Sequence, residues 1–341
     1  MLVIDGSMGE GGGQVLRTCL ALALCRGEAF RIEHVRSRRA RPGLLAQHLA
    51  AVRAAARVGS ARVRGDTLGS DELVFEPEAA RPGRYEFQIG TAGSTTLVLQ
   101  TVLPALLVAA GPSDVSIEGG THNPLAPPFE FLAQAFLPLL ERMGPRVHAR
   151  LVRPGFYPAG GGLLQVSATP ARLHPLHLRE RGAIRSLRAR ALLSRLPRHI
   201  AERELEVLGR ELDIPGESLH VQPVLDARGP GNAVIVEVQC EHVTEVFAGI
   251  GIRGVSAEVV AQALVDEVRR YLVADVAVGE HLADQLLVPL ALAGGGSFVT
   301  LRPSSHATTN AEVIRKFLDV EIELVELGAD RWEVRLERRE R

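Results

Sequence analysis

Apolar and polar residues alternate along this chain with two periods, one typical of helices and one typical of strands. Three long apolar runs have helical spacing, and each ends at a glycine, which readily adopts the left-handed conformation found at helix C-termini. A β-type segment follows each of these helices, and a second amphipathic helix follows each β-type segment. The expected first helices are Gln14–Gly27, Ser94–Gly111 and His281–Gly294, the β-type segments are Phe30–Val35, Val115–Glu118 and Phe298–Leu301, and the second helices begin near Gly43, Pro128 and Thr309.

This order of elements occurs three times, so we interpret the chain as three tandem units, each with two helices on one face of a β-sheet. Two strand-like runs close the last unit, at Glu321–Glu326 and Arg331–Glu337. The chain between Gly111 and Gly294 is much longer than the chain between Gly27 and Gly111, which indicates an inserted domain. We therefore expect an α/β (α+β) fold. Three βαβαββ-type repeats form its large domain at 1–179 and 276–341, and a smaller α/β domain is inserted between repeats two and three at 180–275.

The inserted segment has its own alternation of strand and helix patterns. The expected strands are Ile184–Leu193, Ala233–Gln239 and Val243–Ala248, and the expected helices are Arg198–Leu212 and Ser256–Leu272.

Charge and lysine content narrow the possible chemistry. The formal net charge of -1 argues against a generic polyanion-binding protein, although the arginine cluster within positions 36–41 could contact phosphate locally. Lys316 is the only lysine, so a phosphate-binding loop that ends in Gly-Lys-Ser/Thr is excluded. If the protein bonds covalently to a nucleotide, histidine is therefore a better candidate than lysine.

Cysteine usage and hydropathy indicate the cellular compartment. Cys19, Cys25 and Cys240 have neither paired nor metal-like spacing, so we expect them to be reduced and structural. The sequence has no apolar run of about 18 residues that is typical of a spanning helix, and Met1–Asp5 enters a strand pattern directly. We expect a cytoplasmic protein without a membrane partner.

Two glycine-rich loops precede the first helices, at Gly6–Gln14 and Gly90–Ser94, and glycine lets the backbone approach a ligand closely. Glu10 lies in the first loop. Its carboxylate could offset the helix dipole, or it could bind a hard cation together with phosphate oxygens, and the residues support both roles equally. Arg17 in the following helix and Arg39 before the next one could bind phosphate through their guanidinium groups, with a surface role as the alternative.

His306 lies in the polar stretch Arg302–Asn310, between a strand and a helix. Thr309 and Glu312 have the spacing of a capping box, so we expect the helix to begin at Thr309 and His306 to lie in the loop before it. Backbone N–H groups and the helix dipole favour phosphate at such a place. A histidine that is hydrogen-bonded within a turn is the alternative interpretation.

Other polar groups could recognise a base. His281, Asp284 and Gln285 share one face at the start of the third first helix, and Asp284 with Gln285 could contact a base edge. The loop Thr121–Phe131 occupies the same place in the second unit as the His306 loop does in the third. Its prolines and Phe131 offer an apolar surface on which a purine could stack, whereas core packing is the better interpretation of Phe129.

Together these motifs resemble the RNA 3′-terminal phosphate cyclase family, and the resemblance covers nearly the whole chain. The matches occur in order along the sequence, which makes them far more specific than one short motif. The matching stretches are Glu10–Gln14 with Arg17, Arg39–Gln47, Gly90–Ser94, Gln100–Leu106, Gly119–Pro128, Gly155–Gly162, Ser256–Val260, Gly279–Gln285 and His306–Asn310.

The resemblance implies an ATP-dependent enzyme that acts on RNA ends in three steps. The histidine that matches His306 attacks the α-phosphorus of ATP, forms histidinyl-AMP and releases pyrophosphate. AMP then passes to the RNA 3′-phosphate to give RNA(3′)pp(5′)A. Finally the vicinal 2′-hydroxyl attacks the activated phosphate, expels AMP and leaves a 2′,3′-cyclic phosphate.

The resemblance also implies roles for individual residues and a divalent metal, Mg or Mn. Two positions depart from the usual family pattern, because Ala307 replaces a frequent leucine and His281 replaces a frequent tyrosine. The implied catalytic residues are His306, Arg17, Arg39 and Gln47, the implied metal ligand is Glu10, and the implied ATP-binding residues are Gln100, Pro127, Phe131, His281, Leu282, Ala283, Asp284 and Gln285.

Two other functions stay open at this point. Some relatives in the superfamily are non-catalytic RNA-binding proteins of ribosome biogenesis, but they lack the histidine that this chain keeps at His306. Enolpyruvyl transferases have similar repeated units and act on small anions without a covalent histidine. The cyclase interpretation implies ATP and an RNA with a 3′-phosphate end as partners, and it implies no obligate protein partner.

Overall fold

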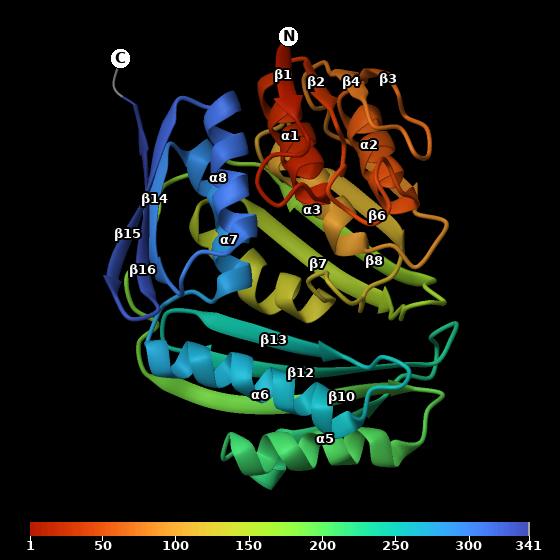
Figure 1. Ribbon diagram of the computed structural model, residues 1–341, viewed down its shortest axis with the longest axis vertical. Coiled ribbons are helices and arrows are strands. Elements are labelled where there is room, and N and C mark those ends of the chain that lie inside the picture. Colours follow the sequence, from red (N-terminus) through yellow and green to blue (C-terminus); the bar gives the residue numbers. More distant parts are fainter. Residues whose placement is uncertain (340–341) are drawn as a thin grey trace.

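A computed structural model describes residues 1–339 of the chain, which form four four-stranded β-sheets packed against helices (Figure 1). The expected α/β class is confirmed. Three of the sheets surround a group of helices that includes α1 and α7, and the fourth sheet lies with α5 and α6 at the lower end of the view in Figure 1.

Three sheets share one strand order. In each of them the first two strands are parallel and the other pairs are antiparallel. The first sheet has the order β1 (Leu2–Asp5), β2 (Phe30–Glu33), β4 (Leu73–Glu76), β3 (Arg62–Arg64). The second has the order β5 (Arg84–Gln88), β6 (Ser113–Gly119), β8 (Gly162–Thr169), β7 (Arg146–Arg153). The third has the order β9 (Leu176–Leu178), β14 (Gly295–Thr300), β16 (Arg331–Arg338), β15 (Val320–Gly328).

Each of these sheets carries two helical segments. Helices α1 (Gly13–Arg26) and α2 (Ala46–Val58) lie along the chain between strands of the first sheet. Helices α7 (Glu280–Ala293) and α8 (Ser305–Phe317) lie between strands of the third sheet. In the second, α3 (Thr95–Leu107) is joined by a π-helix, η1 (Phe131–Phe136), that continues into α4 (Leu137–Arg142).

The fourth sheet is built from the segment between β9 and α7. Its strand order is β11 (Leu219–Pro223), β10 (Ile184–Ser194), β12 (Gly231–Cys240), β13 (Thr244–Ile250). The helices α5 (Arg198–Glu211) and α6 (Ala257–Ala274) contact each other and this sheet, and a short 3-10 helix, η2 (Gly216–Ser218), precedes β11. Because β9 pairs with β14, the segment interrupts the third sheet rather than lying wholly before it. The domain bounds given above stay a prediction.

The apolar first helices lie between the sheets. Helix α1 contacts α2, α3 and α8, and its residues from Val15 to Leu24 are almost all buried. A helix that is covered on several sides needs apolar residues around most of its circumference. This burial explains why α1 appears in the sequence as a nearly continuous apolar run, interrupted only by Gln14, Arg17 and Thr18.

Helix ends differ from the sequence expectations at several points. Helices α1 and α7 end at Gly27 and Gly294 in the left-handed conformation, as expected, but α3 ends at Leu107 with Val108 as its cap rather than at Gly111. The second helices begin at Ala46, Phe131 and Ser305 rather than near Gly43, Pro128 and Thr309, and strand β11 was not expected.

The expected capping box at Thr309 is wrong. Ser304 caps α8, because its side chain accepts a hydrogen bond from the backbone N–H of Ala307. The hydroxyl of Thr309 instead donates to the carbonyl oxygen of Ser305. Two Ser/Thr groups competed for the cap, and the earlier one prevails. His306 therefore lies in the first turn of α8 rather than in the loop before it.

The hydropathy of the helices bears on whether the chain could cross a membrane. No helix among residues 1–339 is long and apolar enough to span a lipid bilayer.

Glu245 in β13 is a buried carboxyl group that joins the fourth sheet to α7. It accepts a hydrogen bond of 2.5 Å from the backbone N–H of Gly279, and burial raises the pKa of Glu245 to about 8. The folded protein therefore keeps a proton on Glu245 at pH values where the unfolded chain has lost it, above about pH 4.5. The stability that this bound proton contributes is complete below about pH 4.5 and is lost as the pH rises through about 8.

We expect Glu245→Gln to have a melting temperature that increasingly exceeds that of the unsubstituted protein as the pH rises from about 4.5 to about 8. The glutamine keeps an acceptor oxygen for Gly279 and has no charge to bury. Thermal unfolding at a series of pH values measures the difference. Glu206→Gln, at an exposed position of α5, is the control; a difference that stays constant with pH for Glu245→Gln would contradict the prediction.

Candidate active site

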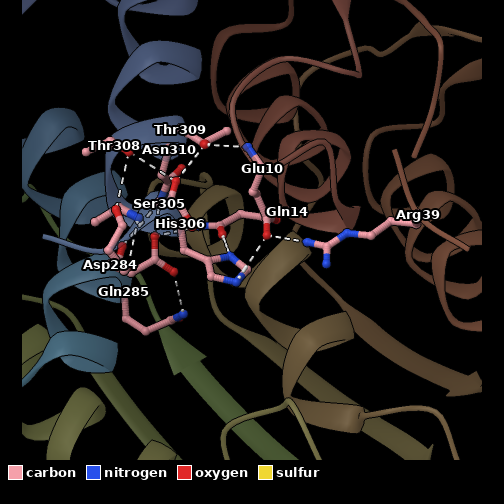
Figure 2. A network of polar contacts seen from close by, with 12 residues as sticks. Glu10, Gln14, Arg39, Asp284, Gln285, Ser305, His306, Thr308, Thr309 and Asn310 are labelled. Carbon is pink, nitrogen blue, oxygen red and sulfur yellow. Dashed lines mark hydrogen bonds and ion pairs between the residues drawn. The ribbon is translucent and has the colours of Figure 1, made fainter. Parts of the chain in front are cut away.

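His306 faces the glycine-rich loop that precedes α1 (Figure 2). Its Nε2 lies 3.1 Å from Oε2 of Glu10, and its Nδ1 lies 2.5 Å from Oε1 of Gln14. The His306 side chain is about half exposed, at 52%, whereas only 7% of the Glu10 side chain is exposed. The ring is thus held between two partners while one side remains accessible.

The glycine loop and α8 approach each other closely. The backbone N–H of Glu10 donates to the hydroxyl of Thr309 at 3.1 Å. Gly9 has a φ of 54°, and a Cβ at Gly9 would come within 1.9 Å of that hydroxyl. Only glycine fits there, so the loop needs it both for its left-handed conformation and for space. This contact sets the position of Glu10 relative to His306.

Glu10 also binds Arg39. The guanidinium of Arg39 donates to the same oxygen, Oε2, that faces His306 (Figure 2). Arg39 lies in the arginine cluster between β2 and α2. Its position in the sequence did not show that it would lie near His306. One carboxylate oxygen therefore holds two cationic groups from two different units of the chain.

The electrostatics favour an ion pair between His306 and Glu10 in the free protein. The hydrogen bond that the ring N–H of His306 donates to Glu10 raises the pKa of His306, against the opposing effect of burial. Burial by itself would raise the pKa of Glu10, but the hydrogen bond with His306 and the charges of His306, Arg39 and Arg17 together hold that pKa below its usual value. A proton is therefore stabilised between the two groups.

Behind His306, a buried chain of hydrogen bonds links three helices. Gln14 in α1 donates to Oδ1 of Asp284 in α7 at 2.5 Å, and Asn310 in α8 donates to the same oxygen at 3.0 Å. Thr18 in turn donates to Asn310 at 2.8 Å. Burial raises the pKa of Asp284, and the hydrogen bonds from Gln14 and Asn310 oppose this effect.

A cavity opens beside this network, between α1, α3 and α7. Its polar lining includes Gln14, Arg17, Gln100, Asp284 and Gln285. Burial lowers the pKa of Arg17 to about 10, so this arginine still carries its charge at neutral pH. Within residues 1–339, the buried Nε2 of Gln100 has no hydrogen-bond partner. The cavity thus offers both a positive charge and a free donor to a ligand.

The structure brings together part of the predicted site. His306, Glu10 and Arg39 are in direct contact, and Arg17, Gln100, Asp284 and Gln285 surround the adjacent cavity. Other predicted ATP-binding residues lie apart from that lining. Phe131, Leu282 and Ala283 are buried in the core, and Pro127 accepts a hydrogen bond from Thr96 through its carbonyl oxygen.

Two further predicted residues have different surroundings. The His281 side chain is 72% exposed, and its Nε2 lies 3.4 Å from Oε1 of Glu267. Gln47 accepts a hydrogen bond of 2.8 Å from the backbone N–H of Ser94 and lines a second, larger cavity. The functional roles of all these residues stay predictions.

The sequence motifs predict no role for Gln14, Thr18, Asn310 or His48. Gln14 and Thr18 are four residues apart on a mostly apolar helix, so their polarity on one face was a usable signal. Asn310 occupied a buried position, and that fact was visible only in the structure. His48 contacts the backbone of Gly13, where a Cβ would come within 2.3 Å of the ring Nε2. Burial, together with the charges of Arg17 and Arg36, lowers the pKa of His48 to about 3.

Glu10 is the metal ligand that the sequence predicts. The described residues contain no group of three or more His, Cys, Asp or Glu side chains that could hold a metal ion. Magnesium often binds through one carboxylate together with substrate phosphates and water, and Glu10 fits that arrangement. His306 and Arg39 contact the same carboxylate oxygen, so a cation would have to compete with them there.

Comparison with known proteins places these residues in a family context. A family model described as RNA 3′-terminal phosphate cyclase matches residues 8–324. The chain is 54% identical over 319 residues to a protein of that name from Ectopseudomonas mendocina, covering 94% of this chain and 93% of the relative. It is 52% identical over 327 residues to one from Koribacter versatilis (96% and 92% covered) and 55% identical over 322 residues to one from Pseudomonas fluorescens (94% and 93% covered).

Proposed function

This chain belongs to the RNA 3′-terminal phosphate cyclase family, and from that premise we propose that it converts an RNA 3′-terminal phosphate into a 2′,3′-cyclic phosphate at the expense of ATP. The observation that carries the proposal is the setting of His306. An accessible imidazole lies between a carboxylate and an orienting amide, beside a cavity with a buried arginine.

The reaction proceeds in three balanced steps. First, a ring nitrogen of His306 bonds to the α-phosphorus of ATP while the bond to pyrophosphate breaks. Second, an oxygen of the RNA 3′-phosphate attacks the same phosphorus, the nitrogen–phosphorus bond breaks, and RNA(3′)pp(5′)A forms. Third, the 2′-hydroxyl loses its proton and attacks the terminal RNA phosphorus, and AMP leaves. A neutral imidazole suits the first step because it is nucleophilic near neutral pH.

The hydrogen bonds around His306 support Nε2 as the reacting nitrogen. Gln14 donates its amide N–H to Asp284 and so presents its carbonyl oxygen to Nδ1 of His306. Nδ1 must then carry a proton, so the neutral ring that forms when Nε2 gives up the proton it shares with Glu10 has its lone pair on Nε2. The same relay fixes the orientation of the ring, because Asp284 is itself held by Asn310.

Charge at the cavity would stabilise the phosphoryl group during transfer. Arg17 carries a positive charge and lines the cavity next to Gln14, so it could bind the triphosphate of ATP. Glu10 would hold a divalent metal together with phosphate oxygens, and when bound that ion supplies positive charge to the transferring phosphoryl group and the leaving pyrophosphate. Gln100 and Gln285 would face the adenosine part of ATP, and Arg39 and Gln47 would act on the RNA end.

We expect Gln14→Leu to slow the formation of the protein–AMP adduct by on the order of tenfold to a hundredfold while ATP affinity changes little, because the ring loses its orientation and its preferred tautomer. Single-turnover labelling with ATP that carries a labelled α-phosphate measures the rate, and equilibrium binding measures the affinity. Gln222→Leu, at an exposed position of β11, is the matched control. A loss of affinity with an unchanged rate constant would contradict a positioning role.

Product analysis tests the function as a whole. Oligonucleotides that end in a 3′-phosphate, a 2′-phosphate or a hydroxyl are incubated with ATP and a divalent metal, and their ends are mapped. The proposal requires a 2′,3′-cyclic phosphate from the RNA 3′-phosphate and no product from the hydroxyl end. Unchanged 3′-phosphate ends in the presence of a folded protein and ATP would overturn it.

A further inference from the structure

A second cavity, of about 1400 Å³, lies where the fourth sheet and its helices meet the first two units. One side is formed by Gln47, the glycine loop around Gly93 and the segment Tyr157–Pro158. The other side is formed by residues of α5, β12 and the chain after β13, among them Ile200 and Ile252. This volume exceeds what one nucleobase needs, and none of the roles assigned above uses the cavity apart from its Gln47 edge.

Two buried polar side chains line the side that belongs to the fourth sheet. Glu204 in α5 is fully buried, Asn232 in β12 is 4% exposed, and the amide of Asn232 donates to Oε2 of Glu204 at 2.9 Å. The remaining oxygens, Oε1 of Glu204 and Oδ1 of Asn232, have no hydrogen-bond partner within residues 1–339. Buried acceptors without a partner are costly, so this pair is suited to a ligand that brings N–H donors.

The cavity is otherwise mainly apolar. Tyr157 is 63% exposed and Ile252 is 54% exposed, although both are large side chains that line the cavity. A tyrosine ring beside proline and aliphatic side chains is a surface on which a flat ring stacks. Arg253 also lines the cavity and is exposed, so it could contact a phosphodiester group next to such a ring.

The first turn of α2 connects this cavity to the candidate active site. Gln47 lines the cavity, while its neighbour His48 contacts Gly13 at the start of α1. Arg39, which precedes α2, contacts Glu10. Two consecutive residues of one helical turn thus touch the two sites. A strand whose 3′-phosphate lies near His306 could therefore reach the cavity with an upstream nucleotide.

We propose that this cavity binds a nucleobase upstream of the RNA 3′ end, stacked on Tyr157 and hydrogen-bonded through its N–H groups to Glu204 and Asn232. The inference rests on the proposed function, because it takes RNA as the substrate. Above pH 7 a phosphate group does not fit the inner surface, since burial raises the pKa of Glu204 to about 7 and the ionised carboxylate and the acceptor oxygen of Asn232 would repel it. Guanine presents two adjacent N–H donors on its Watson–Crick edge, whereas uracil presents one donor between two carbonyl oxygens, so guanine is the preferred base.

The test uses the full-length protein and fluorescent RNA oligonucleotides with a 3′-phosphate, in which each of the last few nucleotides is made abasic in turn. Binding is measured by fluorescence anisotropy, and cyclisation is measured on the same oligonucleotides. We expect one abasic position to weaken binding about tenfold, as the loss of one stacked base does. Equal binding of all abasic oligonucleotides and the intact one would overturn the proposal.

Variants assign the effect to the cavity. Tyr157→Ala should weaken binding of the intact oligonucleotide about tenfold. It should not weaken binding of the oligonucleotide that is abasic at the sensitive position any further, since both changes remove the same stack. Losses that multiply would contradict the assignment. Leu68→Ala, at a residue that is 66% exposed and lies outside the cavity lining, is the matched control and should bind normally.

Base identity tests the hydrogen-bonding part. Guanine should bind more tightly than uracil at the sensitive position, and Glu204→Gln should abolish that preference, with the fold checked by thermal unfolding. Equal binding of guanine and uracil to the unsubstituted protein would refute the role of Glu204.

Labelling of the protein by ATP needs no RNA and must persist in every variant. Its absence from the unsubstituted protein would mark a failure of the proposed function, whereas normal labelling with base-independent RNA binding would mark a failure of this inference alone.

Discussion

His306→Ala is expected to abolish the labelling of the protein by ATP that carries a labelled α-phosphate. The alanine has no nitrogen to form the bond to phosphorus, and the structure offers no lysine nearby as a substitute, since Lys316 lies near the other end of α8. Cyclisation of RNA 3′-phosphate ends should fall below detection in the same variant, because the later steps need the AMP that His306 transfers.

The control for this experiment is His220→Ala, at an exposed histidine of β11, which should be labelled normally. Because the His306 side chain is about half exposed and contributes little to the core, the variant should fold, and thermal unfolding verifies this. Undiminished labelling of His306→Ala would place the nucleophile elsewhere. An unsubstituted protein that is never labelled would instead favour the two alternative functions, a non-catalytic RNA-binding relative or an enolpyruvyl transferase.

Glu10→Gln is expected to slow the formation of the protein–AMP adduct by about a hundredfold to a thousandfold, the range found when one strong charge-stabilising group is removed from an active site. The substitution keeps the size of the side chain but removes its charge. The phosphoryl group thereby loses the proposed metal ligand, and His306 and Arg39 lose the carboxylate that they share.

Labelling rates over a range of magnesium or manganese concentrations measure this effect. The unsubstituted protein should depend steeply on the metal, and Glu10→Gln should need much more of it. Glu28→Gln, at an exposed position just beyond the C-terminus of α1, is the matched control and should behave normally. A variant with a normal metal dependence would show that Glu10 is not the metal ligand, and its role would then be limited to positioning His306 and Arg39.

The sequence predicted the secondary structure closely wherever one element had one clear period. Helix α1 and helix α7 end at the glycines that were expected, and β10, α5 and α6 lie within a few residues of their predicted bounds. It failed where two local signals competed or where the pattern was short. Ser304 prevailed over Thr309 as the cap of α8, and the alternating pattern of β11 extends over only five residues.

The amino-acid sequence by itself determined the α/β class and the family of the protein, and it predicted which residues could react. A nucleophile, a hard-cation ligand and a phosphate-binding arginine are properties of side chains, and the motifs that contain them can be read without coordinates. The order of the motifs along the chain was sufficient to recognise the family, because each motif lies within one short segment.

Only the tertiary structure decided which of these residues meet. Glu10, Arg39, Asp284 and His306 lie far apart in the sequence, yet they form one network because the close contact at Gly9 and Thr309 joins the first unit to the third. The same packing revealed Gln14 as a hydrogen-bond partner of His306, and it placed Gln47 in a different cavity. Distances between segments depend on how helices and sheets pack, and no pattern within a single segment encodes them.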